Sequence, residues 1–142
     1  MEFEFNEKFY AKMTNAEIVS TCSAMNNSAF RRHLDGRIWA NDPDVFFLRN
    51  DGMHKAKYTM DQKRLLAKVN NMFGNVLFVS DNIGAYNEEQ MNILLNAYNK
   101  FDGKILRVDR NENIIEVTYK AVDGKHKFWY NNVTGETEDK IL

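Results

Sequence analysis

The sequence is poor in cysteine, proline and histidine. Its 142 residues include one Cys, one Pro and three His. A single cysteine, Cys22, cannot form a disulfide within the chain and cannot anchor a zinc site by itself. The histidines His33, His54 and His126 are spaced too widely to share one helix face, so we expect no metal site. The shortage of cysteine fits a reducing compartment, and we expect the protein in the cytoplasm.

The sequence also lacks an excess of either charge and any long hydrophobic run. Nineteen Lys and Arg against twenty Asp and Glu leave a formal net charge of -1. We therefore expect neither nucleic acid nor an anionic membrane as a partner. No run approaches the ~20 apolar residues of a membrane span, and residues 1–10 lack the pattern of a secretory signal. A hydrophobic content of 44% nevertheless suffices for a packed core, which excludes a wholly disordered chain.

Residues 1–101 alternate between helix and strand signals, the order typical of parallel α/β folds. Thr59 followed by Gln62 has the spacing of a capping box, and Asn87 has a capping side chain. The predicted helices cover 15–25, 29–34, 59–73 and 88–101, with Ser28 as the cap of the second. The predicted strands are a short one at Phe3–Phe5, one at 37–42, and a buried one at 75–79.

Residues 102–142 have a different pattern, with strands of alternating polarity separated by turn residues. The alternating runs are 104–110, 113–122 and 125–131. Asp123-Gly124 between two such runs is a strong hairpin signal, and residues 132–135 are typical of another turn. We therefore predict two units: an α/β segment over 1–101 and an antiparallel β meander over 102–142.

Two polar clusters follow predicted strands of the first unit. These are Asn41-Asp42-Pro43-Asp44 and Ser80-Asp81-Asn82. Parallel α/β folds place functional groups at the carboxyl ends of their strands, where carboxylates can bind sugar hydroxyls, metals or protons. The alternative is that both clusters are ordinary turn and capping residues. Trp39 has the same ambiguity, since it can stack on a sugar or belong to the core.

Three segments together resemble the melibiase-type α-galactosidases of glycoside hydrolase clan D. They are Trp39-Ala-Asn-Asp-Pro-Asp44-Val-Phe-Phe-Leu-Arg49, Tyr58-Thr-Met-Asp-Gln62 and Val76-Leu-Phe-Val-Ser-Asp-Asn82. In that family such segments form the last part of a (β/α)₈ barrel, and an antiparallel β domain follows. The match covers residues 28–101, while 103–142 fit the β domain in position and character only.

The resemblance implies retaining glycoside hydrolysis by two carboxylates, without a cofactor. The nucleophile's Lys-x-Asp segment and the acid/base segment of the family are not found here, so we assign no catalytic residue. The resemblance implies that Asp44 contacts the sugar and that Asp42 holds the loop. Trp39 joins Asp44 as a sugar-binding candidate, and Asp81 and Asn82 join Asp42 as supporting residues.

A closed barrel needs eight strands and about 250 residues, so this chain matches only a partial barrel. Parallel strands without neighbours leave exposed edges and apolar surface, and we therefore expect a homo-oligomer. The expected function is that of an α-galactosidase-like segment that is inactive alone and binds an α-galactoside or related sugar. The alternatives are a non-catalytic carbohydrate-binding module and a protein-interaction module.

Overall fold

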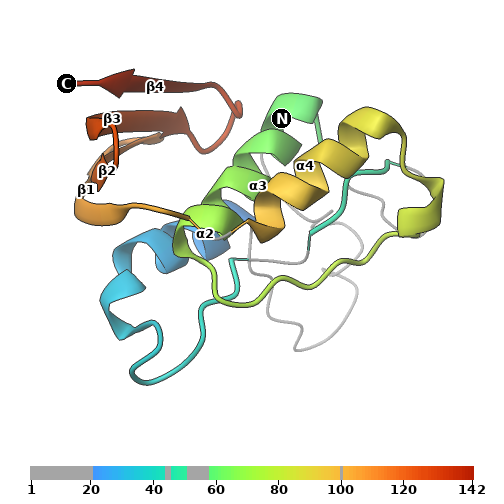
Figure 1. Cartoon of the computed structure of the whole chain (residues 1–142), viewed down its shortest axis with the longest axis horizontal. Coiled ribbons are helices and arrows are strands. Elements are labelled where there is room, and N and C mark those ends of the chain that lie inside the picture. The colour runs from blue at the N-terminus through green and yellow to red at the C-terminus, as the bar shows by residue number, and fades with distance from the viewer. Residues whose placement is uncertain (1–20, 44–45, 51–57, 100) are drawn as a thin grey trace.

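The computed structural model describes residues 21–43, 46–50, 58–99 and 101–142 and gives a mixed α/β fold. The predicted strand at Phe3–Phe5 and the predicted helix over residues 15–20 lie outside these ranges, as do Asp44 and Val45. The helical elements are α2 (Thr21–Phe30), η1 (Arg32–Leu34), α3 (Met60–Phe73), η2 (Ile83–Ala85) and α4 (Glu88–Tyr98). The strands are β1 (Lys104–Asn111), β2 (Ile114–Ala121), β3 (Gly124–Asn131) and β4 (Thr137–Ile141). Figure 1 shows α3 in the middle, with α4 on one side and the sheet on the other.

The four strands form one antiparallel sheet in the order β1-β2-β3-β4, which confirms the predicted meander. Alternation along β2 and β3 directs one side chain in two toward the helices, as the sequence predicted. The cross-strand pairs Ile115–Tyr130 and Val117–Phe128 are buried on this face. The Asp123-Gly124 hairpin is also confirmed, with Gly124 at φ 145°. β4 follows the turn at 132–135 and pairs with β3, although no strand was predicted there.

Helix α3 begins and ends where the sequence predicted. Thr59 Oγ1 accepts the Gln62 N–H and Gln62 Oε1 accepts the Thr59 N–H, so the capping box is complete. One apolar face of the helix is buried and carries Leu65, Leu66, Val69, Met72 and Phe73. The helix ends at Gly74, where a Cβ would lie 2.7 Å from the Asn70 carbonyl oxygen. Glycine therefore permits the close approach that lets the chain turn away at this point.

Two other helices differ from the prediction. Ser28 does not begin a new helix, because α2 runs through it to Phe30 and its hydroxyl donates to the Ala24 carbonyl at 3.1 Å. Helix α4 has the predicted Asn87 cap but ends at Tyr98. Helix α4 contacts α3, and its buried residues are Leu94 and Ala97, whereas Leu95 and Tyr98 are 54% and 58% exposed.

Residues 41–43 and 46–48 lie beside residues 75–81, and the two segments run in the same direction, with α3 between them in sequence. Phe46 and Val79 form a parallel bridge, in which Phe46 N–H donates to the Phe78 carbonyl at 2.9 Å. Ser80 N–H donates back to the Phe46 carbonyl at 3.0 Å. The predicted strand at 37–42 is wrong, because the chain turns between Gly36 and Trp39. The pairing with the second segment starts only at the Asn41 carbonyl.

No helix in the described part of the chain is both long and apolar enough to cross a membrane.

Candidate functional site

The Asp81 carboxylate joins the carboxyl ends of the two parallel segments. Its Oδ2 accepts the backbone N–H of Leu48 at 2.5 Å and that of Arg49 at 2.9 Å. The same oxygen accepts the Tyr86 hydroxyl at 2.7 Å. Because hydrogen bonds to a charged acceptor are among the stronger ones in proteins, Asp81 fixes the end of the first segment against the second.

Two side chains from the helices hold the carbonyl of the same residue, Leu48. The Lys63 ammonium donates to this oxygen, and Gln90 Nε2 donates to it at 3.2 Å. Lys63 is only 1% exposed, and its Nζ lies 5.9 Å from the centre of the Phe47 ring. The backbone of Leu48 therefore donates its N–H to a carboxylate and accepts at its carbonyl from an ammonium. These two charged partners fix the orientation of the residue.

The Tyr86 hydroxyl belongs to this network as a donor. Burial raises the pKa of Tyr86, and the hydrogen bond to the Asp81 carboxylate raises it further. The phenol therefore keeps its proton at neutral pH and does not act as a base. We call the group formed by Leu48, Lys63, Asp81, Tyr86 and Gln90 the Asp81 network.

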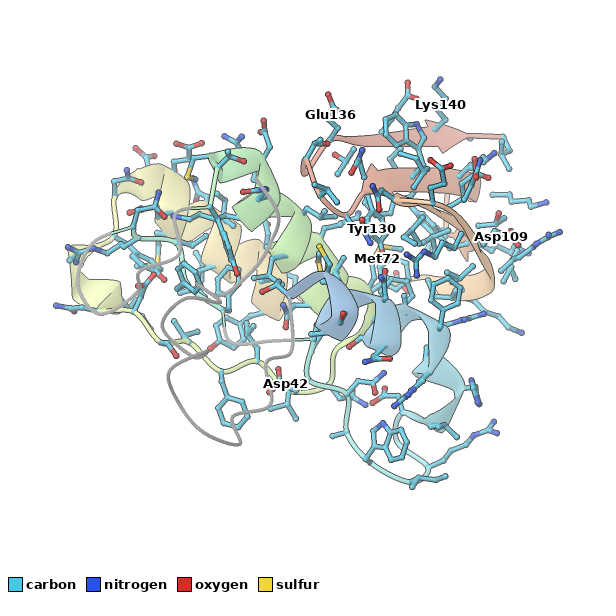
Figure 2. All side chains as sticks on the ribbon, turned by 180° about the vertical axis from the view of Figure 1, so that it is seen from behind. Asp42, Met72, Asp109, Tyr130, Glu136 and Lys140 are labelled. Atoms are coloured by element: carbon cyan, nitrogen blue, oxygen red, sulfur yellow. The ribbon has the colours of Figure 1, made fainter. Side chains whose placement is uncertain are left out.

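The predicted site residues are divided between the two ends of the parallel pair. Asn41 accepts from Asn75 and Val76 at the start, whereas Leu48 meets Asp81 at the other end. Along the second segment, Asp81 follows Val76 by five residues, which at ~3.3 Å per extended residue separates these ends by roughly 15 Å. The structure therefore does not bring Asp42 together with Asp81, and Figure 2 shows Asp42 well away from the sheet.

The remaining candidates are placed as follows. Trp39 is 43% exposed, and its indole N–H donates to Asn41 Oδ1 at 3.0 Å. Asp42 is exposed. Asn82 is exposed as well, and its side chain caps η2 by accepting the Gly84 N–H at 3.1 Å. Asp44 lies outside the described residues.

The sequence prediction missed the contributions of Lys63, Tyr86 and Gln90. Lys63 could have been found from the sequence, because it is a charged residue on the same side of the helix as the apolar residues Leu65 and Leu66. A buried lysine needs an acceptor, which indicates a polar contact inside the fold. Gln90 gave no separate signal, since its place in the capping box of α4 already explained it.

A second polar cluster lies on the sheet, around His126. Its Nε2 lies 2.9 Å from Asp123 Oδ1 and its Nδ1 lies 3.4 Å from Asp139 Oδ1. The Tyr119 ring stacks on the imidazole at 4.8 Å, and its hydroxyl donates to Asp139 Oδ2 at 2.7 Å. The cluster connects side chains of β2, β3 and β4, and it therefore stabilises the packing of these three strands.

Among the described residues, no group of three or more His, Cys, Asp or Glu is arranged to hold a metal ion. Comparisons of the chain with known protein families and with curated proteins returned no match. The resemblance to α-galactosidases therefore remains a prediction from the sequence motifs.

Proposed function

We propose that this chain is a segment of an α-galactosidase-like glycoside hydrolase and contributes part of a (β/α) barrel. The observation that supports this best is the parallel pairing of Asn41 and Phe46 with the segment 75–81, which follows α3 in the chain. Two of the three motif segments thus lie as neighbours, which is how consecutive strands of a barrel are arranged.

The proposed sugar site lies at the carboxyl ends of this pair, beside the Asp81 network. The Asp81 carboxylate already accepts hydrogen bonds from the backbone N–H groups of Leu48 and Arg49. We therefore propose that the network supports the site and does not contact the sugar. The exposed Asn82 is the residue proposed to contact hydroxyl groups in this site. Asp44, the sugar ligand expected from the resemblance, lies outside the described residues. Trp39 lies next to the start of the pair at Asn41, at the opposite end, and the proposed site therefore does not include it.

The isolated chain should bind galactose without hydrolysing α-galactosides. The test is a titration of the 142-residue chain with D-galactose, followed by amide NMR, with D-glucose as the matched sugar. We expect saturable shifts around residues 80–82 with galactose, and we expect Asn82→Ala to weaken them. Asn92→Ala, at an exposed position of α4, is the matched control.

Two results would contradict the proposal in different ways. If neither sugar gives a saturable shift near residues 80–82, the sugar site is wrong. If the chain alone releases nitrophenol from a nitrophenyl α-galactoside, the site assignment is incomplete, because turnover requires a pair of carboxylates.

A second candidate function is supported by exposed apolar side chains. Ile38, Phe78, Leu95 and Tyr98 are each more than half exposed, so these large apolar side chains are available to pack against another protein surface. We propose that these residues contribute to contacts with another protein surface, and that the chain forms a homo-oligomer. Light scattering after size exclusion measures this directly; a monomer that persists at high concentration would contradict self-association.

A further inference from the structure

The outer edge of strand β4 is not paired in the sheet. β4 ends the strand order and pairs with β3 on one side. The Leu142 N–H donates to the Lys125 carbonyl at 2.8 Å, and such bonds recur at every second residue of an antiparallel pair. The residues between them direct their backbone N–H and C=O groups away from β3: Thr137, Asp139 and Ile141. No described backbone group bonds to this outward row, and Figure 1 shows β4 at the upper margin of the molecule.

The charge pattern of β4 is complementary to itself. Asp139 lies on the face of the sheet that meets α3, since its carboxylate is 3.8 Å from the Lys68 ammonium. Glu138 and Lys140 therefore lie on the opposite face, where Lys140 Nζ is 2.9 Å from Glu138 Oε1. When a second β4 is placed antiparallel with Asp139 opposite Asp139, Glu138 of each copy faces Lys140 of the other. Opposite charges at directly opposed positions stabilise a pair of strands, and in this register the two outward rows also bond to each other.

The two Asp139 carboxylates lie nearest the axis in this register. Each carboxylate accepts the Tyr119 hydroxyl at 2.7 Å and lies 3.4 Å from His126 Nδ1. These contacts hold the side chain against its own sheet. A Lys68 ammonium stands beside each carboxylate, so the negative charges of both copies have a positive charge next to them. The repulsion between like charges at opposed positions is thereby reduced.

A groove of about 320 Å³ lies between α3 and β4. Its lining includes the apolar side chains of Leu65 and Phe128 and extends to Thr137. Ile141 is 63% exposed and lies on the same face of β4 as Thr137. In the register described above, Ile141 of each copy lies opposite Thr137 of the other, beside this groove. A second copy therefore brings an exposed apolar side chain to each of the two grooves.

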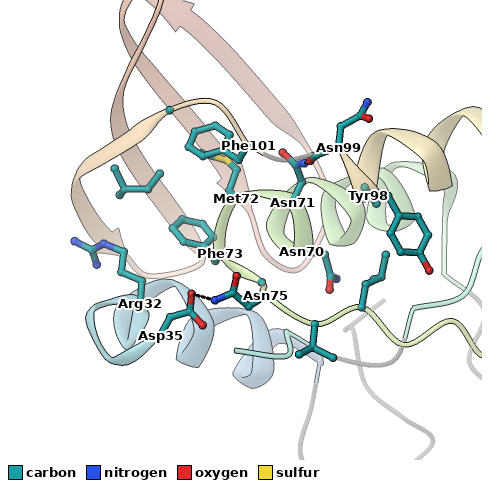
Figure 3. Close-up of a pocket in the computed structure, with 16 residues that line it drawn as sticks. Arg32, Asp35, Asn70, Asn71, Met72, Phe73, Asn75, Tyr98, Asn99 and Phe101 are labelled. Carbon is teal, nitrogen blue, oxygen red and sulfur yellow. Dashed lines mark hydrogen bonds between the residues drawn. The ribbon is translucent and has the colours of Figure 1, made fainter. Parts of the chain in front are cut away.

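A larger cavity, of about 550 Å³, lies where the ends of α3 and α4 meet the segment 74–77 and the start of β1 (Figure 3). It shares no lining residue with the groove beside β4. A strand added to β4 therefore leaves this larger cavity unoccupied.

We propose that β4 pairs antiparallel with β4 of a second copy about a two-fold axis at Asp139, so that the two four-stranded sheets become continuous. The proposal names a surface for the homo-oligomer proposed above and rests on it. The outward backbone groups bond across the axis, Glu138 of each copy meets Lys140 of the other, and Ile141 packs at the groove. Because the paired strands are short, the interface is small, and we expect a dissociation constant of roughly 10–100 µM.

The first test follows amide hydrogen exchange of the unmodified chain by NMR, at protein concentrations from about 10 µM to about 1 mM. The amides of Thr137, Asp139 and Ile141 should exchange roughly tenfold more slowly at the highest concentration. The amides of Glu138 and Lys140 should not depend on concentration, because they already bond to β3. Protection of the three outward amides at every concentration would mean that another segment covers the edge, and it would overturn the proposal.

The second test measures self-association of charge-reversal variants by sedimentation equilibrium. Glu138→Lys and Lys140→Glu each place like charges opposite one another across the axis, and each should weaken the dimer at least roughly tenfold. An equimolar mixture of these two variants has opposite charges between unlike copies, so it should associate about as tightly as the parent. Lys120→Glu, at an exposed position of β2, should dimerise as the parent does. Mixed with Glu138→Lys, it reproduces the same net charges and should not restore the parent affinity.

The possible failures are distinguishable. A monomer at every concentration would overturn this pairing together with the proposed homo-oligomer. An oligomer without concentration-dependent protection at β4, or one that the charge reversals leave unchanged, would overturn the β4 pairing alone. The galactose titration is independent of each of these outcomes.

Discussion

Replacement of Asp81 with alanine should lower the free energy of unfolding by about 3 kcal/mol. The Leu48 N–H, in a residue that is 1% exposed, would be left without an acceptor, which costs ~1–3 kcal/mol. The Arg49 N–H and the Tyr86 hydroxyl would lose bonds to the same charged oxygen, although water can replace these in part. The parallel pair should loosen first at this end, because Asp81 accepts both of these N–H groups from the second segment.

The measurement is urea unfolding at pH 7 together with the thermal midpoint, which should fall by about 10 °C. Asp81→Asn keeps an acceptor oxygen without the charge, and it should cost about half as much. Asp102→Ala, at an exposed carboxylate, is the control and should change stability by less than ~0.5 kcal/mol. If Asp81→Ala is as stable as this control, the Asp81 network does not hold the two segments together.

Two further predictions concern the contacts of the sheet. Gly135→Ala should destabilise the protein by about 2 kcal/mol or more. The φ of Gly135 is 85°, and a Cβ at this position would lie 2.5 Å from the Gln62 nitrogen. The control Gly84→Ala should be nearly neutral, because the nearest atom to a Cβ at Gly84 lies 3.4 Å away. His126 should make stability depend on pH, because its hydrogen bond to Asp123 raises the pKa of the imidazole above 6.5 in the folded state. The stabilisation is complete below the unfolded pKa, near pH 6.5, and is lost as the pH rises through the folded value, which urea unfolding across pH 5–9 will show.

Each of these predictions has a clear contradicting outcome. Equal stability of the Gly135→Ala and Gly84→Ala variants would mean that the turn at 132–135 does not approach α3 as described. For the pH dependence, His126→Gln should remove the loss of stability above pH 6.5, while His33→Gln, at an exposed site, should leave it. An unchanged pH profile in His126→Gln would assign the titration to another group.

Much of the secondary structure was predictable because its signals are local. The capping box at Thr59 and Gln62, the Asn87 cap and the Asp123-Gly124 hairpin each depend on residues within a few positions of one another. The exceptions are instructive. Ser28 has the residue type of a helix cap, but its hydroxyl donates to the Ala24 carbonyl instead, so that the helix continues through it. A serine allows both arrangements, and neighbouring residues do not decide between them.

The polar clusters were found from the sequence, but their arrangement was not. Asp81 was predicted, with Asp42 and Asn82, to support a sugar site. Its partners in the structure are the backbone N–H groups of Leu48 and Arg49, 33 and 32 residues away in the chain. A shift in where a strand begins moves every side chain along it by ~3.3 Å per residue. The prediction began the first strand too early, and this placed Asp42 at the wrong end.

The amino-acid sequence by itself determined helix α3, the start of α4, the hairpins of β1 to β3, and which face of β2 and β3 is buried. Only the tertiary structure decided where the segment around Phe46 pairs with 75–81, that Lys63 is buried against Leu48, and that Asn70 Oδ1 is buried without a hydrogen-bond partner. The physical reason is the range of the forces involved: capping, turn and alternation patterns act between near neighbours, whereas burial and hydrogen-bond partners depend on segments that meet only when the whole chain packs.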